Sequence, residues 1–385
     1  MKRKVLFITS IRSDFYIQKS FIDAVKKHKK LKELVIVSGA HLSKKFGYTY
    51  DEVKKNDYNI ISKINNLIIS DKLEARVGGL SNQLQKLIKI VIKYQPNFIV
   101  SPYDREESLT MAIVGIYLNI PIVHLGAGEK TSVNVDGIVR HSVSKLSHIF
   151  FTSSEENKKR LIKLGEEEWR IFNVGHTSKE RFLATKSIKL NSLNKILETK
   201  IMEKYIILIQ HPVSNWFEKT KNHILTTLEA VDKINMQTFI ILSNSDPGSQ
   251  IITREVKNFR FKKNKNVKYF NNLKEDIFVN LFKNASIILG NSSAGILEAH
   301  HFKIPVVNIG LRQTDRQNYG NILFVKHSVS SIIKGIRKSL YDKDYIKKIN
   351  KIKDPNAKLN PGKKMASILA RINISNKLIN KIITY

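Results

Sequence analysis

The chain has 385 residues, of which 66 are Lys or Arg and 33 are Asp or Glu; its formal net charge is +33, and 42% of the residues are hydrophobic. Length and apolar content suffice for two domains with separate cores, and the lack of cysteine excludes disulfides, zinc ribbons, iron–sulfur clusters and thiol nucleophiles. No stretch reaches the roughly 18 apolar residues of a membrane span, and the apolar run Val5–Ile8 is shorter than a signal core. We therefore expect a soluble, cytoplasmic protein without a membrane span.

Short β-branched runs alternate with amphipathic segments of helical length along the chain. In the first half the expected strands are Val5–Thr9, Leu34–Ser38, Phe98–Ser101, Ile120–Leu125, Ile149–Thr152 and Arg170–Val174. In the second half they are Tyr205–Gln210, Phe239–Ser243, Ile287–Gly290, Val306–Ile309 and Ile322–Val325. Strands that are apolar on both faces and alternate with helices predict α/β domains, each built on a Rossmann-like, doubly wound parallel sheet.

The two sets of strands predict two domains that face each other across a cleft. We place the N-terminal domain at residues 1–180 and the C-terminal domain at residues 181–365. The last segment, 366–385, has Ile and Leu at helical spacing. It is expected to be either a helix that crosses back onto the N-terminal domain or a dimer contact, and periodicity does not choose between them.

The excess of positive charge raises the question of a nucleic-acid partner, because a basic surface attracts phosphate backbones. The lysines are, however, spread along the whole chain beside Asn and Ile, as in residues 262–266. This distribution indicates compositional bias and solvated lysine faces, so no nucleic-acid partner is expected. The charge still favours an anionic ligand.

In parallel sheets ligands bind outside the carboxyl ends of the strands, so the residues that follow each strand are the candidates for a site. Charged, hydroxylic and imidazole side chains recur there, and they include Arg12, His124 and His211. A helix cap explains any single Ser, Asp or Asn in such a place, but Arg and His are not turn formers. These residues together indicate a polar ligand at this edge of the sheets.

The segment Gly290–Gly295 is the clearest candidate for phosphate binding. Its small residues join an expected strand to an expected helix, where free backbone amides and two serine hydroxyls can approach a phosphate. The pattern is neither GxGxxG nor a Walker motif, so neither NAD nor ATP is inferred. Glu298, one to two turns into the same helix, can accept hydrogen bonds from ribose hydroxyls, and Arg12 and Arg312 can pair with a diphosphate.

Several ordered motifs resemble those of one enzyme family over roughly residues 4–325. They are Ile8–Asp14, Ser38–Ser43 with Phe46–Thr49, Asp104-Arg105, Asp136–His148, His211-Pro212-Val213, Asn244 with Asp246 and Gly248, Gly290–Ser293, and Arg312-Gln313 with Arg316. In these motifs the chain resembles the UDP-N-acetylglucosamine 2-epimerases, specifically the hydrolysing branch that serves sialic-acid-like biosynthesis. The tripeptide that begins at His211 is the feature typical of that branch.

The resemblance implies a GT-B-like pair of Rossmann-type domains, with UDP held mainly by the C-terminal domain and the sugar between the two. It also implies loss of UDP from a UDP-N-acetylhexosamine, a 2-acetamidoglycal intermediate, and addition of water with the opposite C2 configuration. By position, the catalytic candidates are Asp104, Asp136, His211 and Glu129. The substrate-binding candidates are Arg12, His41, Arg105, Arg140, Asn244, Asp246, Asn291, Ser292, Ser293, Gly295, Glu298 and Arg312.

Within this set the resemblance assigns Arg105 and Arg140 to orienting the carboxylates. The sequence shows no HxH, HExxH or closely spaced acidic cluster, so no metal and no other cofactor is expected. The expected partners are the UDP-sugar substrate and further copies of the chain in a homodimer or homotetramer.

Two departures from the family pattern adjoin the expected sugar site. Tyr103 replaces the glycine before Asp104, and Gly126 stands where many relatives have Glu or His. One acid/base group of the family is then either missing or supplied by Glu129. The expected substrate is UDP-N-acetylglucosamine, with UDP-N,N'-diacetylbacillosamine as the substrate of a reshaped pocket. A GT-B glycosyltransferase, a basic surface-binding protein and an inactive relative remain the alternatives.

Overall fold

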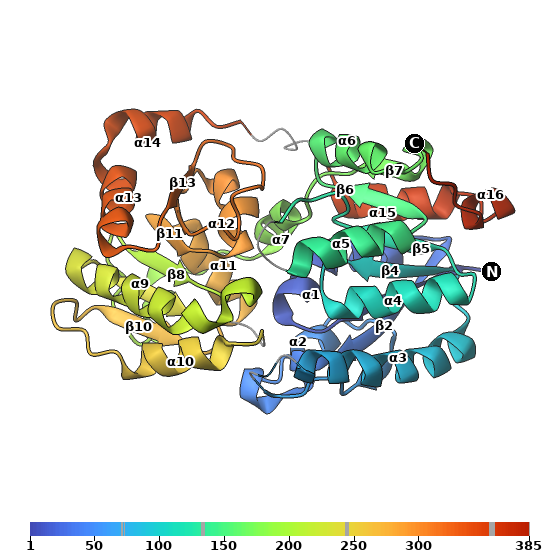
Figure 1. The fold of residues 1–385 in the computed structure, drawn as a ribbon, viewed down its shortest axis with the longest axis horizontal. Helices are drawn as coiled ribbons and strands as arrows, with labels where there is room; N and C mark the ends of the chain where they lie inside the picture. The colour runs from blue at the N-terminus through green and yellow to red at the C-terminus, as the bar shows by residue number, and fades with distance from the viewer. Residues whose placement is uncertain (71, 73, 132–134, 243–245, 354–358, 385) are drawn as a thin grey trace. The chain divides into compact units, whose positions relative to one another are not determined.

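The computed structural model describes residues 1–70, 72, 74–131, 135–242, 246–353 and 359–384, and the chain forms two compact units (Figure 1). The described residues of Met1–Lys130, Val135–Arg181 and Lys358–Tyr385 form unit 1. Thr131 and the described residues of Phe182–Ala357 form unit 2. Helix α7 (Ser178–Ala184) contains the boundary between the two.

In its described residues unit 1 contains a parallel sheet of seven strands in the order β3-β2-β1-β4-β5-β6-β7. Its strands are β1 (Arg3–Thr9), β2 (Leu31–Ser38), β3 (Ile60–Ile64), β4 (Phe98–Pro102), β5 (Ile122–Leu125), β6 (Ile149–Thr152) and β7 (Ile171–Asn173). Its α-helices are α1 (Arg12–Lys27), α2 (Tyr50–Lys54), α3 (Glu74–Tyr94), α4 (Glu106–Tyr117), α5 (Val135–Leu146), α6 (Glu155–Lys163), α15 (Pro361–Arg371) and α16 (Asn376–Ile379). Its 3₁₀ helices are η1 (Gly39–Leu42), η2 (Lys44–Phe46) and η3 (Glu168–Arg170).

Unit 2 contains a parallel sheet whose six described strands have the order β10-β9-β8-β11-β12-β13. They are β8 (Ile206–Ile209), β9 (Thr238–Ile241), β10 (Val267–Phe270), β11 (Ile287–Gly290), β12 (Val306–Ile309) and β13 (Ile322–Val325). The α-helices are α8 (Leu190–Ile196), α9 (Thr220–Ile234), α10 (Ser249–Asn258), α11 (Glu275–Lys283), α12 (Ser293–Leu297), α13 (Val329–Tyr341) and α14 (Lys343–Asn350), and the 3₁₀ helices are η4 (Ser214–Lys219) and η5 (Ala299–Phe302). None of the helices in the described parts of the chain has the length and apolar character that crossing a bilayer requires.

Successive residues of the central strands enter two cores, one on each face of the sheet. In β1, Val5 and Phe7 pack in one core of unit 1, whereas Leu6 and Ile8 pack in the other. Strand β8 shows the same alternation between the two cores of unit 2. Because both faces are covered, these strands are apolar throughout, and the prediction of two Rossmann-like, doubly wound α/β units is confirmed.

Two strands, β3 and β10, lie outside those expected from the sequence. Each is an edge strand of its sheet. In β3 only Ile64 is fully buried, and in β10 Tyr269 is 43% exposed. An edge strand pairs on one side only and does not need two apolar faces, so its sequence lacks the signal of a central strand. At the end of β9 the expected strand runs to Ser243, which lies outside the described residues.

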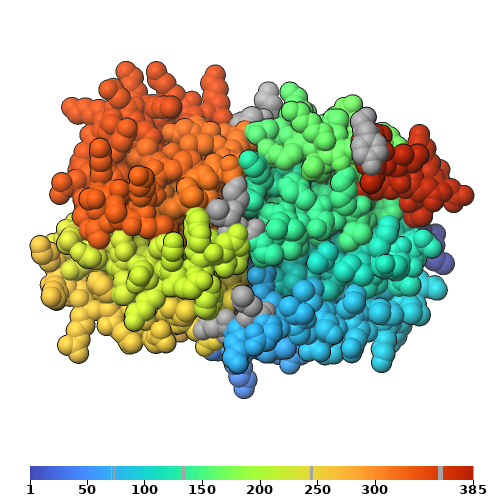
Figure 2. Space-filling view, in the orientation of Figure 1, coloured from blue at the N-terminus to red at the C-terminus, as the bar shows by residue number. Residues whose placement is uncertain are grey.

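The C-terminal segment completes a core of unit 1. Helix α15 packs against α1, and its Met365 and Leu369 belong to the same core as Val5 and Phe7. A Cβ on Gly362 would lie 2.4 Å from the Ser20 carbonyl oxygen, which shows how closely the two backbones approach. All of α15 therefore belongs to unit 1, including the residues before 366 that the sequence placed in the C-terminal domain. Figure 2 shows the last residues that the structure describes, in red, on the surface.

Candidate active site

The order of strands places a switch point in each sheet. In unit 1 the chain runs from β1 to its neighbour β2, toward one edge strand, and from the adjacent β4 to β5, toward the other edge strand. In unit 2 it diverges in the same way at β8 and β11. Crevices at the carboxyl ends of such strands are where doubly wound sheets bind ligands. Most of the site residues predicted from the sequence follow one of these four strands, and the two units are described in turn.

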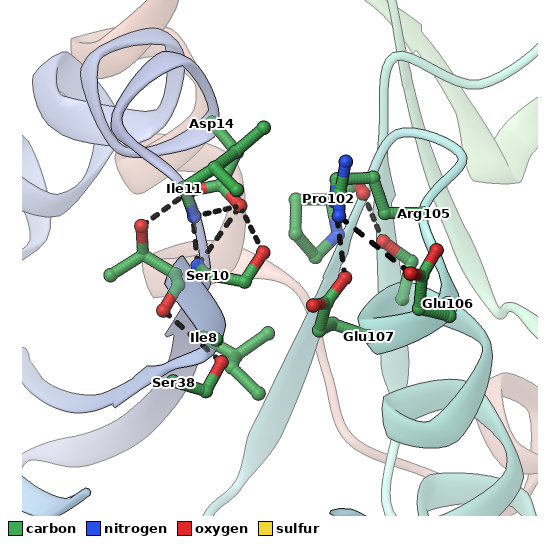
Figure 3. A network of polar contacts seen from close by, with 12 residues as sticks. Ile8, Ser10, Ile11, Asp14, Ser38, Pro102, Arg105, Glu106 and Glu107 are labelled. Carbon is green, nitrogen blue, oxygen red and sulfur yellow. Dashed lines mark hydrogen bonds and ion pairs between the residues drawn. The ribbon is translucent and has the colours of Figure 1, made fainter. Parts of the chain in front are cut away.

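The loop after β1 is organised by one carboxylate. Asp14, in the first turn of α1, accepts hydrogen bonds from the backbone amides of Ser10 (3.0 Å) and Ile11 (3.2 Å) and from the Ser10 hydroxyl (2.7 Å; Figure 3). The Thr9 hydroxyl also donates to it. Asp14 thereby shapes the turn that places Arg12, a predicted diphosphate ligand, at the first position of α1.

His41 lies in the next loop and is fully buried. Its Nε2 lies 2.9 Å from the Thr9 hydroxyl oxygen, and its Nδ1 lies 2.6 Å from the Thr49 hydroxyl oxygen. Burial lowers the pKa of His41 to about 4, although the nearby Asp14 carboxylate opposes the shift. This predicted substrate-binding residue therefore joins two loops as a neutral imidazole.

Strand β4 ends in a second polar network (Figure 3). Arg105 Nε lies 3.2 Å from Glu107 Oε2, and Arg76 Nη2 lies 2.6 Å from Glu106 Oε2. Burial raises the pKa of Glu107 despite the Arg105 guanidinium, whereas two guanidiniums outweigh burial and hold the pKa of Glu106 below its ordinary value. Arg105, predicted to orient catalytic carboxylates, thus contacts two carboxylates that the sequence analysis did not select. The sequence could have identified Glu106 and Glu107 by their position, since both lie in the first helical turn after the buried strand β4.

Arg140, on α5, is the centre of the carboxylate cluster of unit 1. Its side chain is 1% exposed, and it forms an ion pair through Nη2 with Asp104, which follows β4. Its Nη1 lies 3.3 Å from Glu129 Oε2 and donates a 2.8 Å hydrogen bond to the Gly126 carbonyl oxygen. Burial disfavours the charge, but Asp104 and Glu129 together hold the pKa of Arg140 above its ordinary value. One buried guanidinium thus brings two predicted catalytic carboxylates together and fixes their orientation.

Two further contacts complete this cluster. The Ser153 hydroxyl donates a 3.0 Å hydrogen bond to Glu129 Oε1, so both oxygens of that carboxylate are held. Asp136 lies in the first turn of α5, one turn before Arg140, and its charge also raises the pKa of Arg140. The helix N-terminus favours a carboxylate at this position. The structure therefore brings Asp104 and Asp136, predicted from two separate motifs, and Glu129, predicted as the replacement for a group missing at position 126, around a single arginine.

In unit 2, Asn291 immediately follows β11 and fixes the end of β8. Its Oδ1 accepts a 2.7 Å hydrogen bond from the His211 amide, and its Nδ2 donates a 2.9 Å hydrogen bond to the His211 carbonyl oxygen. Arg312 donates to the Asn291 carbonyl oxygen at 3.0 Å. A Cβ on Gly290 would lie 2.1 Å from the Ile209 carbonyl oxygen, so the close approach of the two strands requires glycine. Asn291, His211 and Arg312 are thus joined by direct bonds.

The remaining predicted residues of unit 2 lie on α12 and next to it. Ser292 is the N-cap, and its hydroxyl accepts a 3.3 Å hydrogen bond from the Ala294 amide. Ser293 begins the helix, and a Cβ on Gly295 would lie 2.9 Å from Val306 Cγ1, so α12 packs closely on β12. Glu298 is 3% exposed and caps the C-terminus of α12 instead of lying one to two turns inside a longer helix.

Of the last predicted pair, Asp246 precedes α10, and its carbonyl oxygen accepts a 3.0 Å hydrogen bond from the Ser249 amide. Asn244 lies outside the described residues. Among the residues that the structure describes, no group of three or more His, Asp or Glu side chains is arranged to hold a metal ion.

The geometry can be compared with known proteins. A family model described as UDP-N-acetylglucosamine 2-epimerase matches residues 23–370. The chain belongs to the UDP-N-acetylglucosamine 2-epimerase family. This confirms the family predicted from the motifs.

Curated members of the UDP-N-acetylglucosamine 2-epimerase family are similar over most of their length. A GDP/UDP-N,N'-diacetylbacillosamine 2-epimerase (hydrolyzing) of Campylobacter jejuni is 33% identical over 323 residues, 84% of each chain. A UDP-N,N'-diacetylbacillosamine 2-epimerase (hydrolyzing) of Legionella pneumophila is 29% identical over 385 residues, 100% of each chain. The crystal structure of UDP-GlcNAc 2-epimerase from Neisseria meningitidis has a TM-score of 0.79 and 20% identity over 96% of this chain and 100% of that chain, so it has the same fold.

Proposed function

We propose that this chain is a hydrolysing 2-epimerase of a UDP-N-acetylhexosamine. In the reaction the C1–O bond breaks and UDP leaves, while the proton on C2 is removed, which leaves a 2-acetamidoglycal. Water then adds to the double bond: its hydroxyl bonds to C1, and a proton returns to C2 on the opposite face. The products are UDP and the free sugar with inverted C2.

The observation that carries this proposal is the pair of carboxylates, Asp104 and Glu129, held on the buried guanidinium of Arg140. The reaction needs one group to remove the C2 proton and another to return it on the other face, so it requires carboxylates in fixed orientations. Asp104, Asp136 and Glu129 are the proposed acid/base residues. Glu129 takes the place of the acid/base side chain that many relatives have at position 126, which is glycine here.

Unit 2 is proposed to bind the nucleotide. Ser292, Ser293 and Arg312 would contact the diphosphate, His211 would assist departure of the leaving group, and Glu298 would contact the ribose. Hydroxyls, a guanidinium and an imidazole are suited to a diphosphate because they donate hydrogen bonds to its oxygens as negative charge develops. The bonds that join Asn291 to His211 and Arg312 support this assignment, since they order two of the donors before substrate arrives.

The sugar we propose is N,N'-diacetylbacillosamine, carried on UDP. Support comes from the names of the two hydrolysing relatives given above, one of which matches this chain over its full length. UDP-N-acetylglucosamine differs at C4 and C6 of the sugar and provides the natural comparison substrate. A GDP-linked sugar is included because one relative is named for both nucleotides.

Proton NMR in deuterated water tests the proposal. Purified protein is incubated separately with UDP-N,N'-diacetylbacillosamine, its GDP counterpart and UDP-N-acetylglucosamine. Free nucleoside diphosphate together with a C2-deuterated manno-configured sugar is the expected result, with the highest rate for UDP-N,N'-diacetylbacillosamine. Release of UDP with the C2 proton retained would contradict epimerisation and indicate hydrolysis or glycosyl transfer. A higher rate with UDP-N-acetylglucosamine would overturn the sugar assignment alone.

A further inference from the structure

The two departures from the family pattern, Tyr103 and Gly126, lie against each other in unit 1. A Cβ on Gly126 would lie 2.4 Å from Tyr103 Cδ1 and 2.5 Å from Tyr103 Cε1. Real Cβ atoms do not come so close to an aromatic ring, so the ring occupies the space of any side chain at position 126. Gly126 also has φ of +74°, which favours glycine. The ring at position 103 therefore fills the space that a side chain at position 126 would need, and the two departures belong together.

The backbone of Tyr103 is held in an unusual conformation by the end of β5. Its φ is +58°, in the left-handed region where a residue with a side chain is strained. The Tyr103 amide donates a 2.8 Å hydrogen bond to the Leu125 carbonyl oxygen, and the ring Nε2 of His124 donates a 2.8 Å hydrogen bond to the Tyr103 carbonyl oxygen. Glycine would relieve this strain, but the chain has a tyrosine at this position.

The hydroxyl end of the ring lies near Thr177, whose hydroxyl donates to the Ile17 carbonyl oxygen at 2.6 Å. Burial, with the nearby Glu129 carboxylate, raises the pKa of Tyr103 above its ordinary value. The phenol therefore stays protonated at neutral pH and is not itself a base. The main chain of Tyr103 is held by Leu125 and His124, and its ring packs against the backbone of Gly126.

The Tyr103 ring is connected to the carboxylate cluster through the backbone of Gly126. The carbonyl oxygen of Gly126 accepts the 2.8 Å hydrogen bond from Arg140 Nη1, and Arg140 contacts both Asp104 and Glu129. We propose that Tyr103 is a positioning residue: its ring holds the Gly126 backbone, which fixes Arg140 and thereby the two carboxylates. This inference rests on the proposed function and adds to it a residue that acts on catalysis without contacting the reacting atoms.

The test is a cycle of substitutions at the two positions. Tyr103→Ala removes the ring, and Gly126→Ala inserts a methyl group into it; each is expected to lower kcat about 30-fold or more with KM changed less than about 3-fold, because orientation is lost and binding is not. Tyr103→Phe keeps the ring and should retain kcat within about 3-fold. The double variant Tyr103→Ala with Gly126→Ala has neither the ring nor the clash, so its kcat should be no lower than that of Tyr103→Ala alone, and the two losses should not multiply.

Several outcomes would overturn the proposal. An unchanged kcat in Tyr103→Ala, or a change confined to KM, would mean that the ring does not position the carboxylates. A double variant whose loss in kcat is the product of the two single losses would mean that the two positions do not act as one unit. A loss in Tyr103→Phe as large as in Tyr103→Ala would assign the effect to the hydroxyl instead of the ring.

Two controls and two substrate-free readouts separate this proposal from the proposed function. Tyr117, which is 83% exposed, provides a matched Tyr→Ala control. Gly320 has φ of +101° with only the Lys348 side chain near its Cβ position, so Gly320→Ala measures backbone strain without the clash. The melting temperatures of the cycle and the Arg140 side-chain NMR signal require no turnover. Non-additive melting temperatures and a shifted Arg140 signal in Tyr103→Ala are expected even if no UDP-sugar is consumed; additive temperatures with an unmoved signal would overturn the proposal.

Discussion

Units 1 and 2 have the same arrangement of strands and differ in the residues at the carboxyl ends of those strands. Apart from β7, which adds a seventh strand to unit 1, the two strand orders correspond one to one, and β1 and β8 have the same place and the same alternation between two cores. At the carboxyl edge, however, unit 1 carries carboxylates paired with arginines, whereas unit 2 carries Asn291, serine hydroxyls and glycines. One architecture thus supports two chemistries, because the residues after the strands are not needed for the cores.

The difference has a physical consequence for stability. The edge of unit 1 buries charge, and a buried ion costs several kcal/mol unless partners surround it, as Asp104 and Glu129 surround Arg140. At the carboxyl edge of unit 2, the two hydrogen bonds between Asn291 and His211 join neutral groups, and Arg312 donates to a neutral carbonyl oxygen. We therefore expect pH and charge-changing substitutions to affect unit 1 more strongly, and we expect substitutions in unit 2 to affect ligand affinity.

Lowering the pH should produce the largest difference in stability between the two units. Burial lowers the pKa of His41 to about 4, of His124 to about 3 and of His148 to about 4, and all three are in unit 1. Between pH 7 and 5 the unfolded chain protonates these groups, near its ordinary pKa of about 6.5, while the folded unit does not, so stability falls as pH falls through this window. Each histidine contributes about 2 kcal/mol over that range and the three together about 6 kcal/mol.

Hydrogen exchange at pH 7 and pH 5, corrected for intrinsic rates, measures the opening free energy of each unit. In unit 2 burial lowers the pKa of His327 to about 4 and also lowers the pKa of His223, and both rings are half-buried. The loss expected from these two is smaller than the loss from the three buried histidines of unit 1. An equal loss in both units would contradict the comparison. In unit 1 a His124→Gln variant should show a shallower dependence on pH than the unsubstituted chain.

Asp104→Asn should show which edge performs the chemistry. The variant keeps the shape of the side chain but cannot transfer a proton as a carboxylate does, so kcat should fall about 10³-fold, equivalent to about 4 kcal/mol. The affinity for UDP, measured by calorimetry, should stay within about 2-fold. A loss of affinity with retained kcat would reverse the assignment of the two units.

Lys381→Met should show the cost of disturbing a buried charge in unit 1. Lys381 Nζ lies 2.6 Å from Glu166 Oε2, and the side chains are 9% and 0% exposed. Removing the lysine leaves Glu166 with Lys145 at 3.1 Å, so a destabilisation of about 3 kcal/mol is expected in urea unfolding. The matched control in unit 2 is Lys233→Met, which breaks an exposed pair with Glu229 and should cost less than about 1 kcal/mol. Equal effects would show that burial does not set the difference.

Ser292→Ala should have the smallest effect. The substitution removes the N-cap of α12 and one proposed phosphate donor, which costs about 1 kcal/mol and weakens UDP binding about 5-fold. Calorimetry measures the affinity for UDP, and steady-state kinetics measure kcat, which should be retained. Ser293→Ala leaves the cap in place and separates the contribution of the hydroxyl from that of the helix. A fall in kcat as large as that of Asp104→Asn would contradict the division between the units.

A structural feature could be predicted from the sequence where it depends on the composition of one short segment. The central strands were predictable because two covered faces require apolar residues throughout, as in β4 and β8. The edge strands β3 and β10 were not, because one free edge and one partner leave little demand on composition. The positions of Asp104, Asp136 and Arg140 were likewise readable from motifs, but their convergence was not.

The sequence by itself determined the two α/β units, the family and the chemical character of the residues after the strands, since these follow from periodicity and from ordered motifs. Only the tertiary structure decided which groups meet. It placed Asp104 and Glu129 on one guanidinium, paired Arg76 with Glu106, and set the ring of Tyr103 where a side chain at position 126 would be. The reason is physical: such contacts join residues that lie far apart in the chain or on different elements, and the packing of those elements fixes their distances.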